Sequence, residues 1–187
     1  AHFDLAWAWW IKLLIGLLLL GAAASFDARM AAWVERVKPM AQLDEGDTGR
    51  ELKFLEQFGQ WACSIIVILG VWLIDKKGKY RAVAIGLSCL ATVGVTYVLK
   101  DMIGRPRPTT ELLAWMHAGD RAWEFAGLSK HGSAWGAFPS AHTTGAFALA
   151  CGLSWFYPRG RALFYGLACI TGVQRVLHNA HYLSDVV

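Results

Sequence analysis

Charged residues are scarce in this chain. Asp, Glu, Lys and Arg make up 17% of its 187 residues, whereas soluble domains average about 25%. A chain with so few charges cannot face water on all sides, which excludes an ordinary soluble domain. The net charge of +4 is modest, and no run of Lys and Arg of the kind that binds nucleic acid is present.

Cysteine is also rare, and the cysteines show neither a CxxC pair nor any metal-type spacing. The four are Cys63, Cys89, Cys151 and Cys169. Each lies inside an apolar block. We therefore interpret them as small packing residues rather than as a disulfide framework or a metal site.

The apolar residues, 56% of the chain, are concentrated in blocks. A helix needs about 20 apolar residues to cross a bilayer, and five blocks come close to this length. They lie at about 5–24, 58–74, 82–99, 140–157 and 161–177, and a sixth begins at Tyr182 before the chain stops at Val187. The pattern predicts one all-α membrane domain over residues 1–187, a bundle of six spans with the sixth truncated or missing.

Two connections between the blocks are long. In 26–57, apolar side chains recur at helical spacing between charged ones, which predicts an amphipathic helix along the membrane surface. The apolar positions are Phe26, Met30, Trp33, Val34 and Val37. The connection 104–138 is rich in Trp and Phe, which suit the headgroup region, and we expect it to form an outer loop over the active site.

Short basic loops predict the orientation of the spans. Segments 75–81 and 158–161 are compact and basic, so both are expected to be cytoplasmic. The connection 25–57 has seven acidic and five basic residues, which fits the opposite side. Alternating spans then place the end of the third block, the start of the fourth and the end of the fifth together on the outer side.

Three cations lie at these outer positions: Lys100, Arg107 and Arg175. Taken singly, a Lys or Arg at a helix end often does no more than anchor that end to lipid headgroups. On one face of the membrane, the three together can neutralise a phosphate dianion, and each guanidinium can bind it through two parallel hydrogen bonds. Their convergence therefore favours an anion-binding site.

The fourth block starts at the sequence Pro139, Ser140, Ala141 and His142. Ser140 alone could be only a helix N-cap. Next to three cations, its hydroxyl and the free N–H groups near Ala141 and His142 predict a phosphate site at a helix N-terminus.

His181 and Asp185 are four residues apart, so they are expected to share one helical face. Such a pair is as often a structural hydrogen bond as a catalytic one. A carboxylate on one ring nitrogen fixes the tautomer and makes the other nitrogen the better nucleophile. His142 has no carboxylate in its own motif, so it suits proton donation to the leaving oxygen.

These motifs resemble those of the type 2 phosphatidic acid phosphatase superfamily, which also includes bacterial acid phosphatases and vanadium haloperoxidases. Residues 100–108 (KDMIGRPRP) fit K-x6-R-P, 139–142 (PSAH) are similar to P-S-G-H, and 175–185 (RVLHNAHYLSD) fit R-x5-H-x3-D. The resemblance covers about residues 58–187. It implies that His181 becomes a phosphohistidine, that His142 is the acid, and that neither a metal nor another cofactor is used.

Three positions depart from the family pattern or complicate it. Ala141 replaces the usual glycine, and its backbone N–H is retained. Gln174 stands where serine commonly precedes the motif arginine, which exchanges a hydroxyl for an amide donor. Arg105 duplicates the Arg-Pro step two residues before Arg107; the family spacing selects Arg107 and leaves Arg105 for a headgroup contact.

His178 lies three residues before the third-motif histidine and could be taken for a metal ligand. Metal sites usually need three or four protein ligands, and no further ligand stands at a suitable spacing. The cations nearby would also repel a metal ion.

The sequence thus predicts hydrolysis of a lipid phosphate or diphosphate at the outer face of a bacterial plasma membrane. Candidate substrates are undecaprenyl diphosphate, phosphatidylglycerol phosphate, phosphatidic acid and a lipid A phosphate. The expected partners are the bilayer and its lipids, with no nucleic acid. The alternatives are a phosphotransferase that moves the phosphate to another lipid and, in a different class, a non-catalytic channel or scaffold.

Overall fold

The computed structural model describes residues 3–41, 51, 54, 56–108, 125–129 and 133–187. Within these ranges every regular element is a helix, which confirms the all-α prediction. The α-helices are α1 (Phe3–Ala41), α3 (Trp61–Ile74), α4 (Gly78–Ile103), α6 (Ala141–Phe156) and α7 (Arg161–Leu177). The 3-10 helices are η1 (Gln57–Gly59), η2 (Gly127–Ser129), η3 (Ser133–Trp135), η4 (Pro158–Gly160) and η5 (Leu183–Asp185).

Two helical segments, Trp9–Val37 and Gly78–Ile103, are long and apolar enough to cross a bilayer. α6 and α7 begin and end within a few residues of the predicted blocks, and α4 is longer than its block at both ends. α3 is apolar but has only 14 residues, because the chain before Trp61 forms η1 instead of a further α-helical turn.

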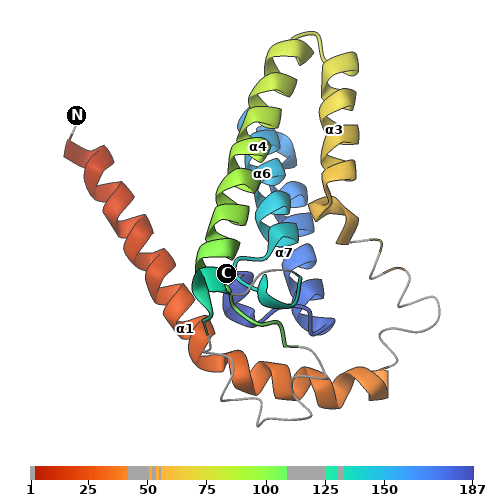
Figure 1. Ribbon diagram of the computed structural model, residues 1–187. Helices are drawn as coiled ribbons and strands as arrows, with labels where there is room; N and C mark the ends of the chain where they lie inside the picture. The colour runs from red at the N-terminus through yellow and green to blue at the C-terminus, as the bar shows by residue number, and fades with distance from the viewer. Residues whose placement is uncertain (1–2, 42–50, 52–53, 55, 109–124, 130–132) are drawn as a thin grey trace.

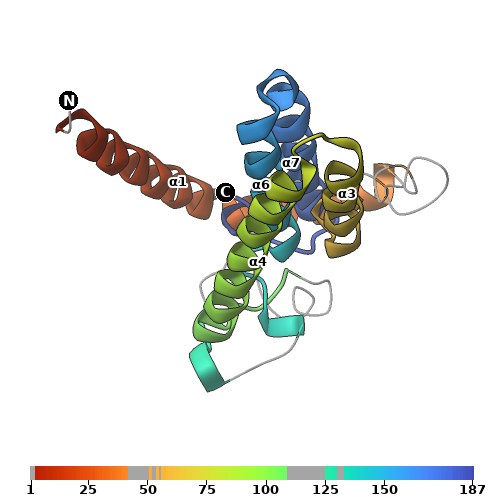
Figure 2. The ribbon, with the colours of Figure 1, turned by 90° about the horizontal axis from the view of Figure 1, so that it is seen from above.

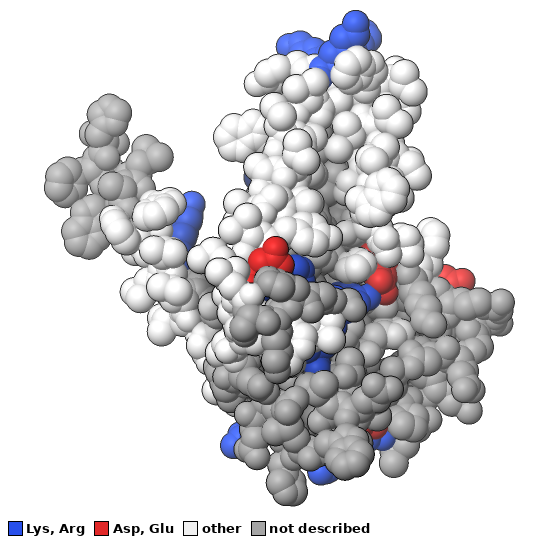
Figure 3. Space-filling view, in the orientation of Figure 1, with Lys and Arg blue, Asp and Glu red and all other residues white. Residues whose placement is uncertain are grey.

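The helices α3, α4, α6 and α7 form a bundle in which α6 packs against both α4 and α7, and α3 packs against α4 (Figures 1 and 2). Ala146 and Ala150 of α6 meet Ala168 of α7 in the core. Such small side chains let helix backbones approach closely, as they do in membrane bundles. Many large apolar side chains, such as Leu90 and Trp155, point outward, and Figure 3 shows this uncharged outer surface. That surface suits contact with lipid.

α1 corrects the prediction of a short span followed by a separate surface helix. The chain is one continuous helix from Phe3 to Ala41, which bends so that its second half passes beneath the bundle (Figure 1). In this half of the helix Phe26 and Trp33 are exposed, whereas Asp27 and Val34 are buried against the rest of the protein. The rest of the predicted surface segment, 42–57, is described only in part.

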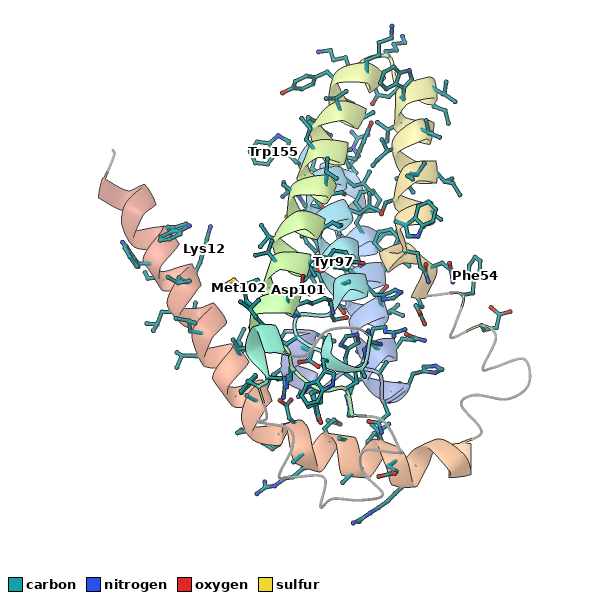
Figure 4. All side chains as sticks on the ribbon, viewed as in Figure 1. Lys12, Phe54, Tyr97, Asp101, Met102 and Trp155 are labelled. Atoms are coloured by element: carbon teal, nitrogen blue, oxygen red, sulfur yellow. The ribbon has the colours of Figure 1, made fainter. Side chains whose placement is uncertain are left out.

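The two basic loops lie at one end of the bundle. Asp75 forms an ion pair with Arg81 at 2.5 Å and accepts a hydrogen bond from the Tyr157 hydroxyl, also at 2.5 Å. Figure 3 shows blue Lys and Arg side chains at this end. The segments that carry the three motifs lie at the other end of α4, α6 and α7, near the labelled Asp101 and Met102 in Figure 4.

Candidate active site

The first motif spans the end of α4 and the segment after it. α4 ends at Ile103, and the next residue, Gly104, has a left-handed φ of +57°. A Cβ on Gly104 would come within 2.5 Å of the Gly127 carbonyl oxygen. Only glycine fits this turn without strain. The chain then runs beside residues 134–137, with hydrogen bonds from the Arg107 N–H to the Ala134 oxygen at 2.9 Å and from the Ala137 N–H to the Arg105 oxygen at 3.0 Å.

The second motif starts α6, and the predicted N-cap is confirmed. The Ser140 Oγ accepts from the Thr143 N–H at 3.5 Å and lies 3.1 Å from the Thr143 hydroxyl. Ser140 is fully buried. The first N–H groups of a helix have no partner inside the helix, so those of Ala141 and His142 lie at its positive end. Ala141 is itself helical, so a Cβ at this position is accommodated.

The third motif corrects the expectation of a helical His181–Asp185 pair. α7 ends at Leu177, and Asn179 follows with a left-handed φ of +54°. Asparagine is one of the few residues that adopt this conformation readily, and it turns the chain away from the helix axis. The pair therefore lies on a turn followed by η5, and no α-helical span begins at Tyr182 in the described chain.

The His181 ring is buried, and its Nδ1 lies 2.7 Å from the carbonyl oxygen of Ala137. A carbonyl can only accept, so Nδ1 carries the proton and Nε2 keeps its lone pair. The predicted partner, Asp185, has its nearer oxygen 3.6 Å from Nδ1, too far for a hydrogen bond. The backbone of Ala137, rather than Asp185, therefore fixes the tautomer.

Burial lowers the pKa of His181, and the nearby negative charge of Asp185 opposes this shift. The imidazole is consequently neutral over a wider pH range than a solvated histidine, whose pKa is about 6.5. A neutral ring with a free Nε2 lone pair is the form that can attack phosphorus.

The Asp185 carboxylate accepts hydrogen bonds from other groups, which explains its distance from the His181 ring. One oxygen accepts from Arg105 at 2.5 Å, and the other accepts from the Tyr182 N–H at 2.8 Å. Arg105 is only 2% exposed and also pairs with Asp27 of α1 at 2.7 Å. Arg105 is thus a buried residue of the site's supporting network, and its assignment to a lipid headgroup is wrong.

The three motif cations come together at this end of the bundle. The charges of Lys100 and Arg107 both act on the His181 ring, and those of Arg107 and Arg175 act on His142. Burial, followed by the charge of Arg175, lowers the pKa of Arg107, although a guanidinium stays charged at any physiological pH.

Buried donors in this cation cluster lack protein partners. Within the described part of the chain, the Nε groups of Arg107 and Arg175 are buried without a hydrogen bond, whereas the Lys100 ammonium donates to the Gly136 carbonyl. Clustered like charges with unpaired donors are costly unless an anion joins them. The arrangement can therefore hold a phosphate beside His181 and His142.

Sequence reasoning missed a carboxylate at this cluster, that of Glu56. Its Oε1 lies 2.6 Å from an Arg175 nitrogen and 3.4 Å from His142 Nε2, and its Oε2 accepts from the Gln174 amide at 2.8 Å. A Cβ on Gly59 would come within 2.2 Å of the His142 carbonyl oxygen, so η1 is pressed against the start of α6. This packing brings Glu56 to the site, and no family motif includes it.

Other candidates add little to the site. Among the described residues, no group of three His, Cys, Asp or Glu side chains could hold a metal ion. Most of the predicted outer loop, including Trp115, Met116 and Trp123, lies outside the described residues. All four cysteines are free.

The described residues are helical, two of the helices are long and apolar enough for a bilayer, and histidines lie beside clustered cations at one end of the bundle. These features fit a membrane protein with a candidate anion-binding catalytic site. The chain belongs to the PAP2 superfamily, whose sequence model matches residues 81–187.

Two relatives carry the name lipid A 1-phosphatase. That of Rhizobium etli is 36% identical over 179 residues, covering 87% of this chain and 70% of the relative. That of Rhizobium johnstonii is 38% identical over 91 residues, covering 48% of this chain and 34% of the relative. No solved structure matches. Family and relatives identify the chain as a phosphatase.

Proposed function

We propose that this chain removes a phosphate group from a membrane lipid through a phosphohistidine on His181. One observation carries the proposal: the Nδ1 of a buried, neutral His181 is held by the Ala137 carbonyl, which leaves Nε2 as the nucleophile beside three cations. The family resemblance assigns the same residue to this role.

The reaction would proceed in two steps. The phosphate oxygens bind Lys100, Arg107, Arg175 and the N–H groups at the start of α6. His181 Nε2 attacks phosphorus, the bond from phosphorus to the lipid oxygen breaks, and His142 gives that oxygen a proton. A water molecule, deprotonated by His142, then attacks the phosphohistidine and releases phosphate. Positioning and charge stabilisation supply most of the rate in phosphoryl transfer.

The names of the relatives suggest the first substrate to test, the 1-phosphate of lipid A. Undecaprenyl diphosphate, phosphatidylglycerol phosphate and phosphatidic acid carry the same reacting group and remain candidates. We further propose six spans in a bacterial plasma membrane, with the site on its outer face. The position of the motifs at the end opposite the basic loops supports this orientation.

The proposal predicts phosphate release without a metal. The purified chain in detergent, given each of the four lipids, is expected to release phosphate from at least one of them at the same rate with and without excess EDTA. The reason is that the guanidinium and ammonium groups supply the positive charge that a metal ion would otherwise provide. Loss of activity on chelation, restored by Mg²⁺, would contradict the proposal. Label that passes to an added lipid acceptor instead of to free phosphate would identify a phosphotransferase.

Glu56 gives a second prediction. Its carboxylate pairs with the Arg175 guanidinium, which the proposed phosphate site also uses. Substitution Glu56→Gln is expected to tighten inhibition by inorganic phosphate about tenfold, which corresponds to about 1.4 kcal/mol. The neutral amide keeps the shape of the side chain and removes the repulsion between two anions. Competitive inhibition constants measure this effect.

The matched control is Glu51→Gln, an exposed carboxylate on the same segment, for which no change is expected. If Glu56→Gln instead weakens phosphate inhibition, the carboxylate serves to hold Arg175 in place rather than to compete with the substrate.

A further inference from the structure

α1 carries a carboxylate that the proposed chemistry does not use. Asp27 lies within the apolar segment Trp9–Val37, and its exposed fraction is 0%. An ionised group in such a helix is costly unless it is paired, and it commonly marks a functional site. The family match begins at residue 81, so Asp27 lies outside the matched region.

Asp27 is linked by hydrogen bonds, along two routes, to the turn that carries Asp185. Directly, its Oδ1 accepts from the Ser184 N–H at 2.8 Å, and its Oδ2 accepts from the Ser184 hydroxyl at 2.5 Å. Indirectly, its Oδ2 accepts from Arg105 Nη2 at 2.7 Å, while Nη1 of the same guanidinium donates to Asp185 Oδ1 at 2.5 Å. Both carboxylates are therefore bound by one planar group of fixed geometry.

The turn between Tyr182 and Asp185 is held on several sides. The Arg105 guanidinium lies 4.3 Å from the centre of the Tyr182 ring, and the Ser140 N–H donates to the Asp185 carbonyl at 2.8 Å. The turn is thus joined to α1, to the segment after α4 and to the start of α6. It also carries the carboxylate that lies 3.6 Å from the His181 ring.

We propose that Asp27 is a positioning residue of the active site, acting through Arg105 and Ser184 on the turn that holds Asp185 beside His181. The inference rests on His181 being the nucleophile. α1 thereby contributes a side chain to the support of the active site. Without the Asp27 carboxylate, the Ser184 N–H and hydroxyl lose their charged acceptor and Arg105 keeps one carboxylate of two, so the turn can relax.

Asp27→Asn in the full chain tests this inference. Displacing a catalytic group by about 1 Å can cost about 10²-fold in rate, and we expect the rate constant of phosphoenzyme formation to fall by about this factor. KM is expected to change less than twofold, because the cation cluster is untouched. The substitution Glu35→Gln, on the same helix and partly exposed, is the matched control and is expected to leave both quantities unchanged.

Rapid-quench measurement of the phosphoenzyme separates positioning from folding. The burst amplitude counts competent molecules, whereas its rate constant reports how well each one reacts. A slower burst of full amplitude supports the proposal, as does partial recovery of the rate in Asp27→Glu. A reduced amplitude at the wild-type rate constant would show a purely structural role and would overturn it.

A second variant keeps the test decisive if Asp27→Asn folds poorly. Ser184→Ala removes one hydroxyl from the same network and is expected to slow the burst by several-fold at full amplitude. Wild-type burst kinetics in both variants would overturn the inference and leave the proposed function standing. The absence of any phosphoenzyme in the unmodified chain would instead count against the proposed function.

Discussion

Replacing His181 with Ala is expected to remove phosphate release from every lipid phosphate, with a loss of at least about 10⁴-fold. In the proposed mechanism the Nε2 atom forms the covalent bond to phosphorus, so its removal eliminates the intermediate rather than weakening a contact. Acid-labile, base-stable label from a ³²P-lipid should accumulate on the unmodified chain and be absent from the variant. Quantitative release of labelled phosphate checks the rate.

The pH dependence of the first step adds an independent measurement. Burial lowers the pKa of His181, so the ring stays neutral as the pH falls below about 6.5, the ordinary histidine value. The rate of phosphoenzyme formation should therefore decline only at lower pH, as the ring gains a proton. An acid limb centred above the ordinary value would contradict the neutral, buried ring.

His178→Gln is the control for the His181 substitution, because it removes a second histidine from the same turn. It is expected to retain activity within a few-fold of the unmodified chain. Label recovered on residue 178, or more than a tenth of the activity surviving in His181→Ala, would exclude His181 as the nucleophile.

The parts of the site that the sequence predicts are those fixed by local spacing. The apolar blocks locate α4, α6 and α7, and their alternation places the motif segments at one end of the bundle. The Ser140 cap is confirmed because a cap depends only on the next three residues. These features follow from the chain's own periodicity and need no knowledge of distant contacts.

The parts that sequence reasoning missed depend on contacts between distant segments. Asp27 and Arg105 are 78 residues apart, and Glu56 and Gln174 are 118 apart; neither pair has a local pattern. The amphipathic pattern of 26–57 does not single out Asp27, because its burial depends on how α1 bends under the bundle. The acceptor for His181 is a main-chain carbonyl, which has no signature in the side-chain sequence.

Substitution of His142 by Gln should have an effect that depends on the leaving group. General acid catalysis contributes about 10² to 10⁴-fold, and we expect a loss of this size for a lipid phosphate, whose alkoxide departs poorly without a proton. For p-nitrophenyl phosphate the first step should slow less than tenfold, because nitrophenolate is a stable anion that needs no proton. Stopped-flow measurement of the nitrophenolate burst gives that first step directly.

The second step makes the His142 prediction more specific, because the same imidazole is proposed to deprotonate the attacking water. In His142→Gln, a fast burst of nitrophenolate should be followed by slow turnover, and labelled phosphohistidine should accumulate on His181. Equal losses in the burst with lipid and aryl phosphates would instead mean that His142 binds the phosphate and does not protonate the leaving oxygen. The Nε2 atom of His142 lies 3.4 Å from the carboxylate of Glu56, which pairs with Arg175 of the cation cluster, so the ring lies beside the proposed phosphate site.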